Sequence, residues 1–155
     1  MKKTFSILIY FVSLFHFYGQ EVRNDDLGDV TDNFQNLFFK ALEQKGIENY
    51  EKAIVLLNKC NTINPNNAAI NFELGKNYYE TNNFTLAENT FKKADSLKPN
   101  NIWILESLYK LYNASINNEK VIETLQKLQE ISPLYEEKIL QFYIKLQYCY
   151  KLFCN

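Results

Sequence analysis

The stretch from Ala68 to Asn101 reads AAINFELGKNYYETNNFTLAENTFKKADSLKPNN and forms the clearest repeating unit of this 155-residue chain. Its one proline, Pro99, lies midway between the other two prolines of the chain, Pro65 and Pro133. Proline is disfavoured inside helices because it lacks an N–H and its ring clashes with the preceding turn, so each proline marks a joint between units. The equal spacing of the three defines one repeat length of about 34 residues, a period typical of stacked helix pairs.

Small residues and aromatic residues recur inside this unit in a fixed order. Two antiparallel helices approach closely only where side chains are small, so Gly75, Ala87 and Ala94 predict the contact seam. The order resembles the tetratricopeptide repeat (TPR) family, which carries a small residue, an aromatic, alanine, an aromatic, alanine and proline at fixed offsets. All of these are present in the unit: Gly75, Tyr78, Ala87, Phe91, Ala94 and Pro99.

The unit before it, residues 32–67, is irregular in its first half. Its second half keeps the pattern through Ala53, Leu57, Cys60 and Pro65. In the first helix Ala41 suits the small position, but Lys40 and Gln44 stand where the family has leucine and tyrosine. We predict a lengthened turn at residues 46–48, and the register of this first helix stays open.

The unit after it, residues 102–135, diverges along the seam. Tyr109, Val121 and Leu128 occupy the three positions that are small in the middle unit. Three large side chains along a helix–helix contact are expected to push the two helices further apart.

The tail, residues 136–155, begins where a fourth unit is expected. Its first-helix core positions hold apolar residues, namely Ile139, Phe142, Tyr143 and Leu146. The segment is apolar on nearly every side, and a helix of this kind is normally buried against other parts of a protein. The tail therefore predicts contact with another chain, as an oligomer or with a partner.

The resemblance implies an all-α fold: an α-solenoid of about three TPR helix-turn-helix repeats plus a C-terminal helix, wound as a right-handed superhelix. Three units are about the minimum for a stable stack. The helix pairs are predicted near residues 32–62, 68–97 and 101–131.

Residues 1–20 have the composition of a secretory signal peptide. Lys2 and Lys3 precede an apolar stretch, residues 5–18, and a small residue, Gly19, lies near its end. The alternative is a membrane anchor, but the stretch is short for a span of about 20 apolar residues. The ending at residues 18–21 also resembles the signal ends of exported Bacteroidetes proteins. Residues 21–31 are acidic and without periodicity, and are predicted to be a flexible lead.

Charge and cysteine content exclude several classes of protein. The chain has 17 basic and 18 acidic residues; losing the two lysines of residues 1–20 leaves 15 against 18, a formal net charge of −3. Such a chain has no electrostatic footprint for nucleic acid. Of the three cysteines, Cys60 is predicted to be a core residue, and Cys149 and Cys154 lie too far around one helix to pair with each other.

Nothing in the sequence predicts catalysis, a metal site or a cofactor. The single histidine, His16, belongs to the predicted signal peptide, so the mature chain lacks the commonest general base and nitrogen ligand. No zinc, nucleophile-elbow or phosphate-loop motif is present in the chain. We therefore expect a protein that is not an enzyme.

The resemblance implies a binding groove on the concave face, which the first helix of each unit lines. The candidate peptide-binding residues are Phe72, Lys76, Tyr79, Trp103, Glu106 and Lys110. Aromatic anchors among polar groups are typical of peptide-binding surfaces. The alternative is that the aromatic residues pack between helices or cover the tail; packing is favoured for Phe72, and both interpretations stay open for Trp103.

Some members of the family bind C-terminal carboxylates through a clamp of lysine, asparagine and arginine residues. The corresponding positions here hold Phe38, Leu42, Glu73, Trp103 and Ser107. None of them is basic, so the resemblance implies that this clamp is absent and that chaperone C-terminal tails are not ligands.

The predicted function is a non-catalytic protein–protein interaction module or scaffold, exported to the periplasm or cell envelope of a Gram-negative bacterium. Its partner is a protein or peptide segment, and the mature chain is expected to have no membrane span. The alternative is that the chain is the N-terminal repeat portion of a longer TPR protein, such as a sensor or envelope-assembly factor.

Overall fold

The computed structural model describes the backbone of residues 26–153 and the side chains of residues 33–147. These residues form seven α-helices and one short 3₁₀ helix, with no strand among them. The elements are α2 (Asp26–Gly46), α3 (Tyr50–Ile63), α4 (Ala68–Glu80), α5 (Phe84–Leu97), α6 (Ile102–Ala114), α7 (Asn118–Ile131), η2 (Pro133–Tyr135) and α8 (Glu136–Phe153). The predicted signal peptide, residues 1–20, lies outside the described residues.

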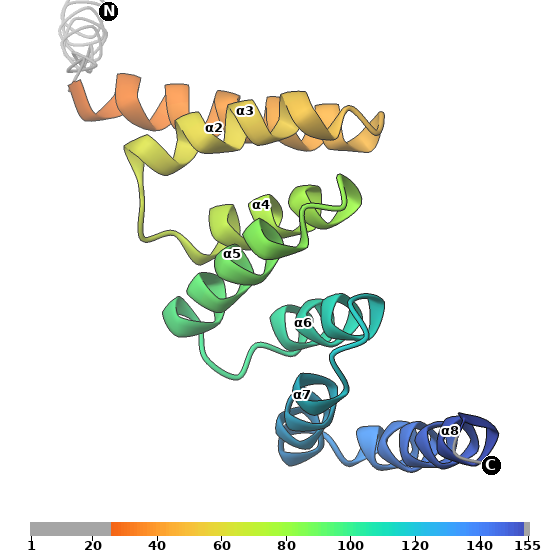
Figure 1. The fold of residues 1–155 in the computed structure, drawn as a ribbon. Helices are drawn as coiled ribbons and strands as arrows, with labels where there is room; N and C mark the ends of the chain where they lie inside the picture. Colours follow the sequence, from red (N-terminus) through yellow and green to blue (C-terminus); the bar gives the residue numbers. More distant parts are fainter. Residues whose placement is uncertain (1–25, 154–155) are drawn as a thin grey trace, which may run out of the picture. The chain divides into compact units, whose positions relative to one another are not determined.

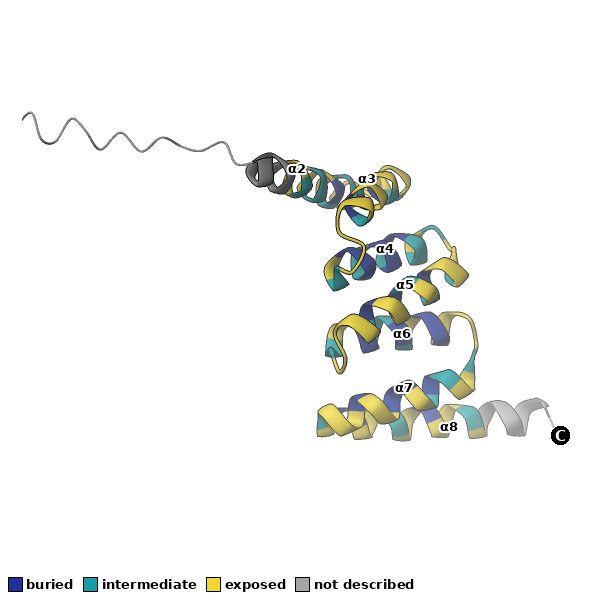
Figure 2. Ribbon diagram, turned by 90° about the vertical axis from the view of Figure 1, so that its left-hand side faces the viewer, coloured by how far each residue is buried: buried dark blue, intermediate teal, exposed yellow. Residues whose placement is uncertain are grey.

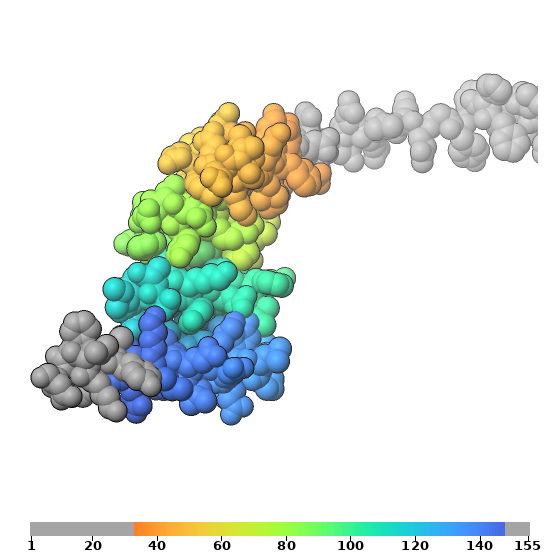
Figure 3. Space-filling model, turned by 90° about the vertical axis from the view of Figure 1, so that its right-hand side faces the viewer, coloured from red at the N-terminus to blue at the C-terminus, as the bar shows by residue number. Residues whose placement is uncertain are grey.

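Within residues 33–155 the helices follow one another as a stack of pairs, which confirms the predicted all-α solenoid (Figure 1). Each helix packs mainly against the next one along the chain, from α3 and α4 through α7 and α8. Figure 3 shows the same order as successive layers of colour in the space-filling view. Buried residues lie between the helices and exposed residues on their outer sides (Figure 2).

The joints between pairs are set by asparagine caps that recur with the repeat. The side chain of Asn67 accepts hydrogen bonds from the backbone N–H groups of Ala69 and Ile70 at the start of α4. Asn101, one repeat length later, accepts from Trp103 and Ile104 at the start of α6. Asparagine is a favoured N-cap because its side-chain oxygen satisfies N–H groups that have no partner inside the helix.

The turns inside the pairs are equally regular, and the prediction of a lengthened first turn was wrong. Three residues separate the helices in every pair, at 47–49, 81–83 and 115–117. In each turn the middle residue is left-handed, with φ of 59° at Glu48, 58° at Asn82 and 58° at Ile116. The glycine that suggested a longer turn, Gly46, is still helical, and the left-handed position after the helix falls to a residue other than glycine.

The predicted seam of the middle pair is where α4 and α5 meet. Ala87 and Ala94 are fully buried, and Phe91 is 1% exposed. A Cβ added to Gly75 would lie 2.5 Å from the Phe91 ring, closer than atoms can approach. Gly75 is therefore required because the Phe91 ring occupies the space of a side chain.

The first pair follows the same frame, which settles the register of α2. Ala41, one repeat length before Gly75, is 1% exposed and belongs to the same core cluster as the buried Leu57. Cys60 is also fully buried, as predicted, while the side chains of the other two cysteines lie outside the described residues. Helix α2 begins at Asp26, so residues 26–31, which were expected to be a flexible lead, are helical.

The third pair has large residues along its seam. Val121 and Leu128 are fully buried, and Tyr109 packs against them from α6. The backbones of α6 and α7 come close to each other at fewer positions than those of α4 and α5. This difference agrees with the expectation that three large seam residues hold the helices apart.

Over residues 136–147, whose side chains the structure describes, helix α8 covers the third pair with one face. Phe142 is 7% exposed, and Ile139 and Leu146 pack against the same core. On the other side Leu140, Tyr143 and Ile144 are between 44% and 61% exposed. Among the described residues, no helix has the length and hydropathy needed to cross a membrane.

Candidate functional site

A pocket of about 210 Å³ opens where the first three helix pairs come together. Helices α4 and α6 contribute most of its wall, and α2, α3 and α5 complete it. We call the surface that α4 and α6 form with the end of α2 the first-helix face. The residues that line the pocket are Lys45, Tyr50, Lys76, Asn77, Tyr79, Glu80, Phe91, Ser107 and Lys110.

A carboxylate beside the pocket holds two of its lysines. The Lys45 Nζ lies 2.8 Å from Glu73 Oε2, and Lys76 pairs with the other oxygen of the same carboxylate. The side chain of Glu73 is only 13% exposed. Burial and the neighbouring ammonium of Lys45 lower the pKa of Lys76. Burial also acts on Lys45, but its hydrogen bond and charge attraction to Glu73 together outweigh burial and raise the pKa of Lys45.

Two predicted aromatic residues serve mainly as packing. Phe72 lies against the core with its ring 6.0 Å from that of Phe91, as favoured by the sequence, and the Lys76 ammonium lies 4.5 Å from its ring centroid. Tyr79 packs against Phe84 at 5.7 Å and still lines the pocket. The rings of Phe72 and Tyr79 are thus part of the helix packing, and the Lys76 ammonium lies over the Phe72 ring.

Of the three aromatic residues predicted for the groove, Trp103 is the one that the structure leaves open to solvent, with 66% of its surface exposed. Ser107 and Lys110 follow it by four and seven residues in α6 and therefore lie on the same side of that helix. Because both of them line the pocket, Trp103 belongs to the first-helix face about two turns away. The interpretation that Trp103 packs between helices is therefore wrong.

Glu106, also predicted for the groove, is engaged elsewhere. The Tyr135 hydroxyl donates to its Oε1 at 2.7 Å, and the Lys138 ammonium lies 3.7 Å from the same oxygen. Burial, followed by the bond to Glu106, raises the pKa of Tyr135 to about 12. Glu106 therefore joins α6 to η2 and α8, and its carboxylate is not free toward the pocket.

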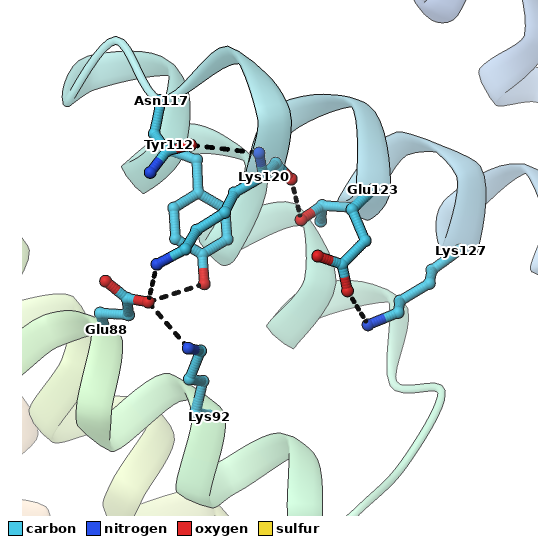
Figure 4. Close-up of polar contacts among 8 residues, drawn as sticks. Glu88, Lys92, Tyr112, Asn117, Lys120, Glu123 and Lys127 are labelled. Atoms are coloured by element: carbon cyan, nitrogen blue, oxygen red, sulfur yellow. Dashed lines mark hydrogen bonds and ion pairs between the residues drawn. The ribbon is translucent and has the colours of Figure 1, made fainter.

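A second polar cluster joins α5, α6 and α7 around Glu88 (Figure 4). Glu88 pairs with Lys120 at 2.6 Å and with Lys92 at 2.9 Å, and it accepts a hydrogen bond from the Tyr112 hydroxyl at 3.2 Å. Lys120 also lies 5.1 Å from the Tyr112 ring centroid. Burial, then the charge of Glu88, raises the pKa of Tyr112 well above its usual range. Every charge of this cluster has a partner within it, so we assign it a structural role.

Sequence reasoning missed the contribution of the first pair to the pocket. Lys45 and Tyr50 belong to α2 and α3, where the register was open. The signal was available, because Lys45 precedes Tyr79 by one repeat length and so falls on the face that lines the groove. Asn77 was missed too, since a buried amide has no signature in a helical pattern. At the clamp positions, Phe38 packs against the core and Glu73 is acidic, so the lysines of the pocket lie at other positions.

Comparison with known proteins agrees with this geometry. The family model described as tetratricopeptide repeat matches residues 42–108. No curated protein matches the chain by sequence.

Several solved structures share the fold. The first TPR of Spaghetti (RPAP3), solved bound to the HSP90 peptide SRMEEVD, has a TM-score of 0.67 at 16% identity, over 75% of this chain and 94% of that one. MamA residues 41-end from Desulfovibrio magneticus RS-1 has a TM-score of 0.66 at 17% identity, over 74% of this chain and 66% of that one.

An enzyme is also among these structures. The K341M mutant of the Thermobaculum terrenum O-GlcNAc transferase has a TM-score of 0.61 at 22% identity, over 67% of this chain but only 20% of that one. Residues 42–108 therefore match the tetratricopeptide repeat family, and the solved structures show that the chain shares the fold of these repeats.

Proposed function

We propose that this chain is a non-catalytic protein-interaction module of the bacterial periplasm or cell envelope, which holds a partner segment on its first-helix face. The observation that carries the proposal is the exposed Trp103 on the same helix side as a pocket built from three helix pairs. Exposed aromatic side chains next to polar groups are the usual anchors of protein interfaces. The structure of RPAP3 with an HSP90 peptide supports a peptide-binding use of this fold.

The proposal that the chain is not an enzyme rests on its side-chain inventory. Among the described residues, no group of three histidine, cysteine or acidic side chains is arranged to hold a metal ion. Glu73, the carboxylate beside the pocket, forms ion pairs with Lys45 and Lys76 rather than facing a second carboxylate as an acid–base pair. The transferase that shares the fold matches this chain over only 20% of its own length, which leaves room for its catalytic part elsewhere.

The envelope location is supported by the basic, apolar and small-residue order of residues 1–20. Fractionation of the host cells, followed by mass spectrometry of the N-terminus, tests it. We expect the protein in the periplasmic or envelope fraction, with its first residue near Glu21. Recovery in the cytoplasm with residues 1–20 still attached would contradict this location.

The binding function is tested by site-specific photo-crosslinking in the native host. A photoreactive residue replaces Trp103 in one variant and Val55 in another; both positions are exposed, at 66% and 55%, but Val55 belongs to α3, outside the first-helix face. We expect a discrete crosslinked protein from position 103 and little from position 55. Equal crosslinking at both positions, or none at 103, would contradict a partner on the first-helix face.

A further inference from the structure

The pocket of the first-helix face carries a net positive charge that its own residues do not neutralise. Lys45, Lys76 and Lys110 contribute three ammonium groups, and Glu73 and Glu80 contribute two carboxylates. Lys45 and Lys76 share Glu73, whereas Lys110 has no ion pair among the residues that the structure describes. One positive charge therefore remains, which matches a single carboxylate better than a doubly charged phosphate.

A buried amide forms part of the pocket wall. Asn77 is 1% exposed, and its amide nitrogen donates to the Glu73 backbone oxygen at 2.8 Å. Its Oδ1 is buried and has no hydrogen-bond partner among the residues that the structure describes. Because this oxygen has no accessible surface, it does not select the ligand. The preference for a peptide over a free inorganic anion rests instead on the exposed Trp103 beside the pocket.

The position of Trp103 indicates a second feature of the ligand, an apolar side chain at a set distance from the acidic one. It precedes Lys110 by seven residues in α6, and at 1.5 Å per residue this separation is about 10 Å along the helix axis. An extended peptide advances about 3.3 Å per residue. An acidic side chain at the pocket and an apolar side chain at Trp103 would therefore stand about three residues apart in the bound segment.

We propose that the first-helix face recognises an extended partner segment in which an acidic side chain enters the Lys45–Lys76–Lys110 pocket and an apolar side chain about three residues away lies on Trp103. This proposal rests on the proposed function and adds the chemistry of the partner. It differs from C-terminal carboxylate binding because the basic residues lie outside the clamp positions.

Short peptides test the proposal directly, because Trp103 is the only tryptophan of the chain and its fluorescence reports binding beside it. The purified chain is titrated with a hexapeptide, blocked at both ends, that carries glutamate and leucine three positions apart. Matched peptides replace glutamate by glutamine, replace leucine by serine, or omit the acidic side chain and leave the C-terminus free. Calorimetry of the same peptides provides a readout that does not depend on tryptophan.

We expect the glutamate peptide to bind about tenfold more tightly than the glutamine peptide, as removal of a charged hydrogen-bonding group implies. Lys110→Gln is expected to weaken the glutamate peptide about as much and to leave the glutamine peptide unchanged. Lys127→Gln is the matched control, because Lys127 is exposed and pairs with Glu123 on α7.

Three outcomes overturn the proposal. Equal affinity for the glutamate and glutamine peptides excludes recognition of an acidic side chain, as does the absence of binding by any blocked peptide. Preference for the peptide with a free C-terminus assigns the pocket to a terminal carboxylate instead. If position 103 still crosslinks a partner in the host, only the chemistry of the ligand is wrong; if it does not, the proposed function fails as well.

Discussion

The second and third repeats use one common frame, and at one pair of seam positions the larger side chain comes from opposite helices. In the second repeat the first-helix seam position is Gly75, and the large Phe91 of the next helix fills the space. In the third repeat the same two positions hold Tyr109 and Leu125, so the large residue has moved to the other helix. The comparison teaches that the repeat determines which positions of the two helices meet. The size of the side chain at each position can vary, provided that the two facing side chains together fill the space between the helices.

The largest expected effect is a loss of stability when the contact between α8 and the third repeat is weakened. Helix α6 continues the stack over the second repeat, whereas the third depends on α8, through the buried Phe142. Phe142→Ala is expected to lower the free energy of unfolding by about 3–5 kcal/mol, because it removes a buried ring and leaves a cavity. Denaturant unfolding measures this loss.

Leu140→Ala serves as the control for that variant, since Leu140 is 61% exposed on the same helix. It is expected to change stability by less than about 0.5 kcal/mol. Equal losses from the two substitutions would show that α8 does not cover the third repeat as described.

A smaller effect is expected at the seam of the second repeat. Gly75→Ala is expected to destabilise the protein by about 1–3 kcal/mol, because the added methyl group collides with the Phe91 ring. Helix propensity alone predicts the opposite sign, a gain of about 1 kcal/mol. Thermal unfolding of this variant beside Gly46→Ala distinguishes the two, since no atom of the described part of the chain lies within 4 Å of a Cβ at Gly46. A stabilised Gly75→Ala protein would contradict the close packing.

The smallest expected effect lies in the turns, where the two repeats differ at one left-handed residue. Asn82 tolerates this conformation, but the β-branched Ile116 is strained there and 79% exposed. Ile116→Asn is expected to stabilise the protein by about 1 kcal/mol, and Asn82→Ile to destabilise it by a similar amount. Melting temperatures of the two variants should move in opposite directions; shifts of the same sign would contradict a strained Ile116.

The sequence was sufficient for the fold because the repeat imposes local rules. Gly75, Ala87 and Ala94 report a close helix contact through their size, and the recurring asparagines report helix starts. The lengthened first turn was predicted from Gly46, but the left-handed conformation falls two residues later at Glu48. A pattern cannot show this shift because the conformation depends on where the preceding helix ends.

The site was less predictable because its geometry depends on which helices meet. The exposure of Trp103 follows from the absence of any neighbour over it among the core clusters, and the engagement of Glu106 follows from Tyr135, 29 residues later. Lys45 reaches the pocket by pairing with Glu73, 28 residues away. These side-chain pairings depend on how far each repeat is rotated relative to the next one. That rotation cannot be read from the sequence of a single repeat.

The central claim is that complementary sizes at fixed frame positions hold each helix pair together, and a double-mutant cycle tests it most directly. The first repeat supplies the design, because Ala41 and Leu57 stand where the second has Gly75 and Phe91. We predict that Gly75→Ala and Phe91→Leu each destabilise the protein, while the double variant is more stable than their sum by about 1 kcal/mol or more. Losses that add within about 0.5 kcal/mol would contradict the claim.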